Sequence, residues 1–198
     1  MCIRDRYSRR PISDEATYEK KLEITRQYFE SNMEVLEIGC GTGTTAIAHA
    51  PYVKHILATD LAPRMIEIAR DKAQDAGIDN VTFEVSSVDA LDVPDGSIDA
   101  VMAHNLQHLL DDREPAIADI HRMLKPGGVF VSSTACIGDL SPLLRLIVPI
   151  GRLLRLFPLV RSFSADDLKR SLDNAGFDID HEWQPKKNAA FFIICRKR

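Results

Sequence analysis

The stretch V-L-E-I-G-C-G-T-G, from Val35 to Gly43, is a short apolar run followed by three glycines at alternate positions. Its apolar half is typical of a buried strand. Glycine adopts turn conformations that other residues avoid, and it lets a ligand approach the bare backbone closely. The segment therefore predicts a strand, a tight turn and a helix beneath it, arranged to hold a ligand of cofactor size.

Composition narrows the class of protein. The chain has 198 residues, of which 45% are hydrophobic and 27% charged, so it is large enough for one soluble domain with a real core. Its net charge of −4 gives no reason to expect a nucleic acid as partner. The four cysteines form no Cys-x-x-Cys pair and accompany no histidines at metal-ligand spacing, so we expect a reduced, cytoplasmic protein without a metal ion.

The beginning of the chain, M-C-I-R-D-R-Y-S-R-R, differs from the rest. It shows neither helical nor strand periodicity, and it lacks the apolar run of a secretory signal. We expect residues 1–13 to be a disordered or non-native leader and residues 14–198 to form a single domain.

Helical and strand patterns alternate after this leader. Pro63 suits the first position of a helix, and Gly77 follows the end of the same helix. Strands separated by helices predict a parallel sheet with helices on both faces. The last two strands are joined by a short Pro-Lys-Lys-Asn turn, which predicts an antiparallel hairpin. Strands are expected at 35–38, 55–59, 81–85, 98–103, 129–134, 179–183 and 191–195, and helices at 14–31, 44–50, 63–76, 113–124 and 165–175.

The glycine spacing separates two kinds of cofactor. A dinucleotide site requires G-x-G-x-x-G, whereas Thr44 stands where the third glycine counted from Gly39 would be. Asp60, at the end of the second strand, is placed to accept hydrogen bonds from ribose hydroxyls, which suits both NAD and S-adenosylmethionine. The chain has no Tyr-x-x-x-Lys pair for hydride transfer, but an NAD(P)-dependent oxidoreductase stays an alternative interpretation.

Four segments together resemble one family. They read V-L-E-I-G-C-G-T-G, A-T-D-L-A-P-R-M-I-E-I-A-R, V-D-A-L-D-V-P-D-G-S-I-D-A-V and H-R-M-L-K-P-G-G-V-F-V. In this order and at these intervals, from about Val35 to Thr134, the chain resembles a class I S-adenosylmethionine-dependent methyltransferase of the small-molecule, single-domain type. The resemblance implies an α/β fold with a doubly wound, Rossmann-like seven-stranded sheet, mostly parallel, with one antiparallel strand in a C-terminal hairpin. It also implies S-adenosyl-L-methionine as cofactor and transfer of a methyl group to a small acceptor by in-line displacement.

The resemblance further implies which residues contact the cofactor. The three glycines would pass under its methionine part, and Glu37 would face its ammonium group. Asp60 would hold the ribose, Leu61 and Met65 would flank the sugar and adenine, and Asp89 would accept a hydrogen bond from the adenine amino group. The full expected set is Glu37, Gly39, Cys40, Gly41, Thr42, Gly43, Asp60, Leu61, Met65, Val88, Asp89, Ala90 and His104.

Several acidic and small residues also have a structural interpretation. The glycines could form a tight turn without a ligand, and Asp89 could be a solvated carboxylate in an acid-rich stretch. Cys40 is expected to pack as a small residue between the glycines. Asp99 is expected to be structural, because it begins a strand, away from the carboxyl edge where ligands bind. A cofactor-binding module without catalysis is therefore a further alternative.

Catalysis in this family mainly requires alignment of the acceptor, exclusion of water and removal of a proton. The chain lacks the Asn-Pro-Pro-Tyr type of motif found in enzymes that methylate amino groups of DNA or glutamine, which disfavours a nucleic-acid base as acceptor. His104 and His108 follow the fourth strand and would share a face of a helical turn. Imidazole can take a proton near neutral pH, so both are candidate catalytic residues, although His108 could pack structurally. Tyr18 and Tyr28 are expected in the wall of the acceptor site.

The segment at 140–162 is rich in leucine and carries several arginines. Pro149 and Gly151 interrupt it, and together with the arginines they exclude a membrane span. We interpret the segment as a lid over the acceptor pocket, with contact to an anionic membrane surface or a dimer interface as alternatives. Such a lid implies a hydrophobic or amphipathic acceptor, and the protein would be a monomer or a homodimer.

Overall fold

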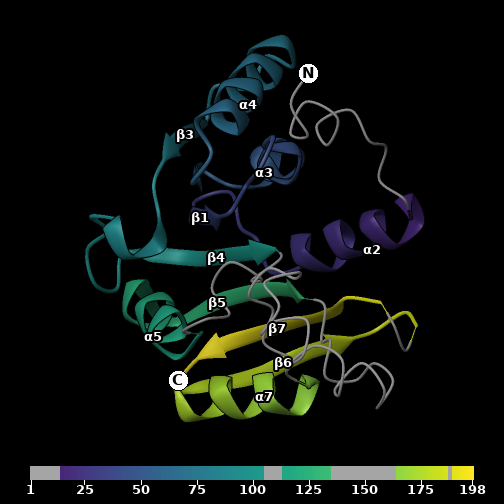
Figure 1. The fold of residues 1–198 in the computed structure, drawn as a ribbon, viewed down its shortest axis with the longest axis vertical. Coiled ribbons are helices and arrows are strands. Elements are labelled where there is room, and N and C mark those ends of the chain that lie inside the picture. Colours follow the sequence, from purple (N-terminus) through teal and green to yellow (C-terminus); the bar gives the residue numbers. More distant parts are fainter. Residues whose placement is uncertain (1–13, 105–112, 135–163, 187–188) are drawn as a thin grey trace, which may run out of the picture.

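The computed structural model describes residues 14–104, 113–134, 164–186 and 189–198. Within them lies one seven-stranded sheet of order β3-β2-β1-β4-β5-β7-β6. Strand β7 runs antiparallel to both of its neighbours, and the other pairs are parallel, which confirms the predicted fold class (Figure 1). The strands are β1 (Glu34–Ile38), β2 (His55–Asp60), β3 (Val81–Val85), β4 (Ile98–His104), β5 (Leu124–Thr134), β6 (Phe177–Trp183) and β7 (Phe191–Lys197).

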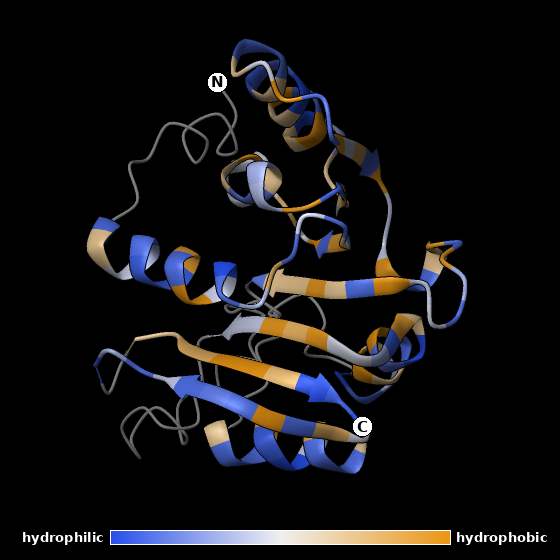
Figure 2. Cartoon of the chain, turned by 180° about the vertical axis from the view of Figure 1, so that it is seen from behind, coloured by the Kyte–Doolittle hydropathy of each residue, from blue (hydrophilic) through white to orange (hydrophobic). Residues whose placement is uncertain are grey.

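Helices cover both faces of the sheet, and two core clusters fill the spaces between them. One cluster joins α2, α3 and α4 to the residues of β4 that include Met102, and the other joins α5 and α7 to those that include Val101. Successive strand residues therefore point to opposite faces, as in any sheet buried on both sides. Figure 2 shows hydrophobic residues concentrated in β5 and β7, whereas α7 is mostly hydrophilic. The helices are α2 (Glu15–Arg26), α3 (Thr44–His49), α4 (Pro63–Asp75), α5 (Arg113–Met123) and α7 (Ala165–Asn174), with single 3-10 turns η1 (Ala50–Tyr52) and η2 (Val88–Ala90).

The first described helix is shorter than the sequence suggests. Helix α2 ends at Arg26, and the backbone N–H of Tyr28 then bonds to the carbonyl of Thr25 at 3.0 Å in a tighter turn. This turn directs Tyr28 and Phe29 toward the core cluster beneath α2 and α3. The sequence pattern predicts a helix that continues to residue 31, but the packing of Tyr28 and Phe29 against the core ends it at Arg26.

Strand β5 begins earlier than expected. Leu124 already pairs with Ile98, although the sequence suggests that the preceding helix includes it and that the strand starts only at Val129. The pairing register of β4 and β5 shifts between Leu124 and Val129. In this stretch a Cβ on Gly128 would lie 2.8 Å from the carbonyl oxygen of Lys125. Glycine at this position lets the chain pass close to its own backbone without leaving the sheet.

Asp99 fixes the amino ends of two strands. Its Oδ2 accepts a hydrogen bond from the backbone N–H of Glu34 at 2.8 Å, and its Oδ1 accepts one from Lys125 Nζ at 2.7 Å. These contacts join β1, β4 and β5 at the edge away from the glycine turn. The predicted structural role of Asp99 is confirmed.

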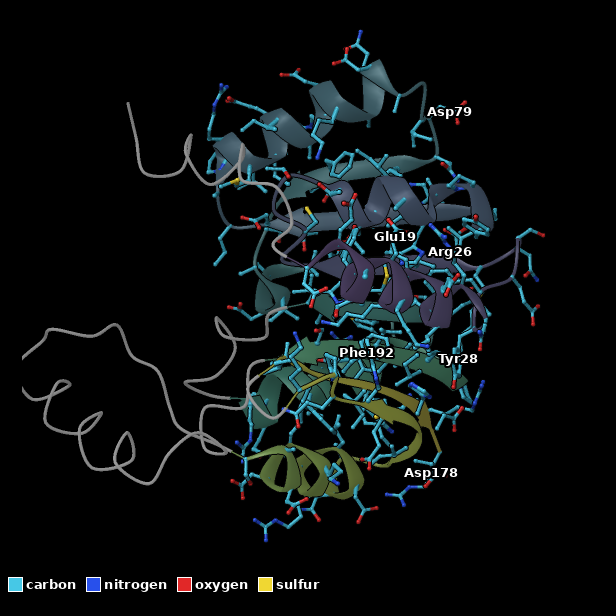
Figure 3. The ribbon with its side chains drawn as sticks, turned by 90° about the vertical axis from the view of Figure 1, so that its right-hand side faces the viewer. Glu19, Arg26, Tyr28, Asp79, Asp178 and Phe192 are labelled. Carbon is cyan, nitrogen blue, oxygen red and sulfur yellow. The ribbon has the colours of Figure 1, made fainter. Side chains whose placement is uncertain are left out.

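Helix α2 lies near the carboxyl ends of β1, β4 and β5, where a ligand would bind. Figure 1 shows α2 beside the tip of β4, and Figure 3 shows the same helix, with Glu19 and Arg26 labelled, between α3 and the lower strands. None of the helices in the described ranges is both long and apolar enough to cross a membrane.

Candidate active site

The three glycines after β1 all have left-handed backbones, with φ of 71° at Gly39, 54° at Gly41 and 71° at Gly43. Their surroundings differ. A Cβ on Gly39 or Gly41 would meet nothing within 4 Å, whereas one on Gly43 would lie 2.7 Å from the ring of Phe83 and 2.9 Å from the Cβ of Ala69. The first two glycines thus leave open space in front of the backbone, and the third allows close packing of α3 on α4 and β3.

The carboxylate of Asp60 holds the glycine turn against β2. Its Oδ2 accepts a hydrogen bond from the backbone N–H of Gly41 at 2.9 Å, and its Oδ1 accepts one from the N–H of Ala62 at 2.9 Å. Each carboxylate oxygen has a second lone pair. Asp60 can therefore support the turn and still accept hydrogen bonds from a ligand.

Lys72 on α4 holds the other side of the turn. Its ammonium group donates to Thr44 Oγ1 at 2.6 Å and to the carbonyl oxygen of Thr42 at 3.2 Å, and burial lowers its pKa. The sequence interpretation did not include this residue. Lys72 lies three positions after Ala69, so both residues are on the face of α4 that packs against the turn. This helical spacing could have indicated Lys72 from the sequence.

Glu37 is a buried carboxyl group at the end of β1, with only 2% of its surface exposed. The backbone N–H of Ala46 is near it, but no described residue bonds to its Oε2. Burial raises the pKa of Glu37 to about 8. A buried carboxyl oxygen without a partner is costly, and a cationic ligand group would remove that cost.

Residues expected near the adenine ring fall into two groups. Leu61 is 65% exposed immediately after β2, and Asp89 is exposed in η2, so both side chains are accessible to a ligand. Met65 and Val88 are buried, and Val88 packs in the core cluster beside α5 and α7. Cys40 is also buried, which fits its expected packing role, and burial raises its thiol pKa.

His104 ends β4 on the face that α2 covers. Its Nε2 is buried without a partner among the described residues, and burial, together with the charge of Lys21, lowers its pKa to about 4. His104 is the register partner of Ser133 on β5. The Oγ of Ser133 accepts a hydrogen bond from Lys21 Nζ at 2.7 Å. Near neutral pH the imidazole is therefore unprotonated and can accept a proton.

Helix α2 contributes one of the two predicted tyrosines to this region. The hydroxyl of Tyr18 lies 3.3 Å from Thr45 Oγ1, just after the glycine turn. Tyr28 lies beyond the end of the helix, past Arg26, with its ring 5.8 Å from the guanidinium of Arg196 (Figure 3). Arg196 donates a hydrogen bond to the carbonyl of Gly127, toward the amino end of β5, so Tyr28 lies away from the carboxyl ends of the strands.

Three other residues near His104 were missed. His49 on α3 is fully buried, neither ring nitrogen has a partner among the described residues, and burial lowers its pKa to about 3. Lys21 and Ser133 were not expected either. Lys21 lies three and four positions before the buried Ile24 and Thr25, so helical spacing places this lysine on the buried face of α2. A lysine at such a position could have indicated a functional residue from the sequence. His108, the leader at 1–13 and the segment at 140–162 lie outside the described residues, and their roles stay predictions.

Comparison with known proteins finds methyltransferases among the relatives of this chain. Residues 35–128 match the family model described as "Methyltransferase domain". The uncharacterized methyltransferase YcgJ of Bacillus subtilis is 36% identical over 97 residues, which are 49% of this chain and 38% of that protein. The arsenite methyltransferase of Halobacterium salinarum is 28% identical over 168 residues, 80% of this chain and 40% of that protein.

Solved structures share the fold over most of the chain. The crystal structure of YcgJ from Bacillus superposes with a TM-score of 0.74 and 21% identity, covering 91% of this chain and 99% of that one. The [4+2]-cyclase SpnF superposes with a TM-score of 0.72 and 18% identity, covering 90% and 80%. The match of residues 35–128 to this family model and the shared fold are consistent with a class I S-adenosylmethionine-dependent methyltransferase. The chain spans less than half the length of the first two curated relatives, 38% and 40%.

Proposed function

We propose that this protein binds S-adenosylmethionine at the glycine turn and transfers its methyl group to a small molecule. The observation that carries the proposal is the Oε2 of Glu37, buried and without a described partner at the end of β1. A cationic ammonium group is the ligand that such a carboxylate binds best. The cofactor, when bound, supplies a methyl group that its sulfonium makes electrophilic.

The surroundings of Glu37 support the same ligand. Gly39 and Gly41 leave space that side chains would fill, so the methionine part of the cofactor can lie against bare backbone. Asp60 retains lone pairs for ribose hydroxyls, and the exposed Leu61 and Asp89 are available to the adenine ring. The roles of these residues in binding are part of the proposal.

The acceptor side is assigned to the carboxyl ends of β4 and β5. His104 is unprotonated near neutral pH, so its imidazole can accept a proton from an acceptor hydroxyl or acidic carbon, but burial lowers its pKa to about 4 and makes it a weaker base than an exposed histidine. The covered position under α2 also limits access of water, which favours transfer to the acceptor over side reactions. The suggestion of a hydrophobic or amphipathic acceptor rests on the sequence of residues 140–162 alone, outside the described residues.

Binding is tested by calorimetric titration with S-adenosylmethionine, S-adenosylhomocysteine and NADPH. We expect the first two to bind and NADPH not to bind. Glu37→Gln is expected to weaken binding of S-adenosylmethionine by roughly tenfold to a hundredfold, because a charge-assisted hydrogen bond is lost. The control is Glu34→Gln on the same strand, where the glutamate pairs with Lys54 near the surface. A folded protein that binds neither sulfur compound at millimolar concentration would contradict the proposal.

Transfer is tested by measuring S-adenosylhomocysteine release with a panel of small apolar phenols, carboxylic acids and ketones. His104→Ala is expected to lower turnover at least tenfold while cofactor affinity stays within about twofold. Equal losses in both would show that His104 has no role in proton removal. Cofactor binding without release of S-adenosylhomocysteine with any member of the panel would favour the alternative of a cofactor-binding module without catalysis.

A further inference from the structure

Lys21 is a cation on the buried face of helix α2. Its side chain is half-buried, and its neighbours along the helix include the buried Leu22 and Thr25. The ammonium group donates a hydrogen bond to Ser133 Oγ at 2.7 Å. Burial lowers the pKa of Lys21, and the more distant charge of Asp14 offsets this only in part.

This arrangement is unfavourable for a residue with only a structural role. A partly buried charge is costly unless an opposite charge compensates it. The hydroxyl of Ser133 is neutral, and the carboxylate of Asp14 favours the charged form of Lys21 by less than burial disfavours it. The ammonium group has three donors, of which Ser133 takes one, and the described residues supply no acceptor for the others. Methionine would fill the same space on α2 without this cost.

The position of Lys21 connects it to the proposed active site. Ser133 and His104 are register partners at the carboxyl ends of β5 and β4, on the face covered by α2. One turn earlier on α2, Tyr18 contacts Thr45 immediately after the glycine turn. The helix therefore extends from the cofactor side to the acceptor side. Lys21 lies on the acceptor side near His104, whose Nε2 is buried without a partner among the described residues.

We propose that Lys21 and Ser133 bind an anionic oxygen of the acceptor, so that the substrate carries a carboxylate or an ionised hydroxyl next to the group that is methylated. This inference rests on the proposed function, because it assigns the acceptor pocket of the same site. Lys21 provides the charge, and Ser133 fixes the position of the ammonium group. The acceptor anion replaces the missing counter-charge of Lys21.

The test uses probes matched in shape but not in charge. Binding of 2-naphthoate and 2-naphthamide, and of the smaller pair benzoate and benzamide, is measured by calorimetry with and without S-adenosylhomocysteine. We expect the carboxylate of at least one pair to bind roughly tenfold or more tightly than its amide, because a charge-assisted hydrogen bond distinguishes them. The preference is expected to decrease at high salt. A second arm replaces the carboxylate by 4-nitrophenol, titrated above and below its pKa, to distinguish an ionised hydroxyl from a carboxylate.

Three variants test whether the preference depends on Lys21 and Ser133. Lys21→Met is expected to bind carboxylate and amide equally, whereas Lys20→Met, which changes an exposed lysine on the same helix, is expected to keep the preference. Circular dichroism and S-adenosylhomocysteine affinity show whether Lys21→Met is folded, and Ser133→Ala, expected to weaken the preference partly, provides a milder second variant.

The possible outcomes separate the two proposals. Equal binding of every charged and neutral probe, binding of none of them, or a preference that survives Lys21→Met would overturn the anion site. Failure to bind S-adenosylhomocysteine would instead overturn the proposed function, and the titrations without that compound would still decide whether Lys21 binds anions.

Discussion

The backbone N–H of Gly41 lies 2.9 Å from Oδ2 of Asp60, so the carboxylate expected to hold the ribose also holds the glycine turn. Strand β2 and the turn after β1 are therefore connected through one side chain. A change in Asp60 is expected to affect both the shape of the turn and the binding of the cofactor.

Asp60→Asn is expected to weaken S-adenosylmethionine binding by at least tenfold and to lower the free energy of unfolding by roughly 1–3 kcal/mol. The amide nitrogen of asparagine cannot accept a hydrogen bond, so the N–H of Gly41 or Ala62 loses its partner. Calorimetry and urea denaturation measure the two effects. Asp71→Asn, at an exposed position on α4, is the control and should change neither. An Asp60 variant with lower affinity but unchanged stability would show that the turn does not depend on this carboxylate.

Gly41→Ala and Gly43→Ala are expected to have different effects. Both residues have positive φ, which costs about 1–2 kcal/mol for alanine. At Gly43 the new methyl group would also collide with Phe83 and Ala69, adding about 1–3 kcal/mol. At Gly41 it would enter open space where the cofactor is expected. We therefore expect Gly43→Ala to lose more stability in urea denaturation and Gly41→Ala to lose more cofactor affinity in calorimetry. The reverse order would contradict the assignment of open space to the ligand.

Cofactor binding is expected to release a proton from Glu37. Burial raises its pKa to about 8, so the free protein holds this carboxyl protonated at neutral pH. A bound ammonium group favours the carboxylate and lowers the pKa. At a pH of about 6.5, where an α-amino group is still protonated, titration in buffers of different ionisation enthalpy should show release of close to one proton. In Glu37→Gln the dependence on buffer should disappear. Heats that are the same in all buffers with the wild-type protein would mean that binding releases no proton, which would contradict this prediction.

The same shift has a consequence for stability. The folded pKa of Glu37 lies above the unfolded value of 4.5, so the folded state holds more protons between these values. The contribution of Glu37 to stability is therefore present at low pH and lost as the pH rises toward about 8. Without cofactor, Glu37→Gln is expected to show a weaker decrease in stability over this range in urea denaturation.

The sequence predicted local features of the site better than contacts between distant segments. The glycine turn, Glu37 and Asp60 lie within or directly after strands, and their residue types already indicate their position at the carboxyl edge. Lys21 and Ser133 are 112 positions apart, so helical periodicity could place Lys21 on the buried face but could not show which strand it meets. The early start of β5 at Leu124 was missed for a related reason, because its pairing with Ile98 depends on the sheet and not on local propensity.

His49 is expected to make the protein sensitive to acid. The imidazole is fully buried, and its folded pKa of about 3 lies below the ordinary value of 6.5. The unfolded state therefore binds more protons between these values, and stability is lost as the pH falls through this range, by at most about 1.4 kcal/mol per pH unit. His49→Phe, whose ring can pack against Phe29, should reduce this slope. Urea denaturation between neutral pH and pH 4 measures the slope, and identical slopes in both proteins would contradict the assignment.

The pKa of His104 is expected to depend on Lys21. Burial is the larger cause of its decrease to about 4, and the positive charge of Lys21 adds to it, with the neutral His49 as another neighbour. Removing the charge in Lys21→Met should therefore raise the pKa of His104 toward 6.5, whereas Lys20→Met should leave it unchanged. The titration is followed by NMR of the imidazole Cε1–H, with His104→Gln to assign the signal.

Binding of 2-naphthoate to the wild-type protein should also raise the pKa of His104, because the anion neutralises the charge of Lys21. If His104 titrates identically in wild type and Lys21→Met, the two side chains are not electrostatically coupled, and Lys21 can affect the acceptor only through its own contacts.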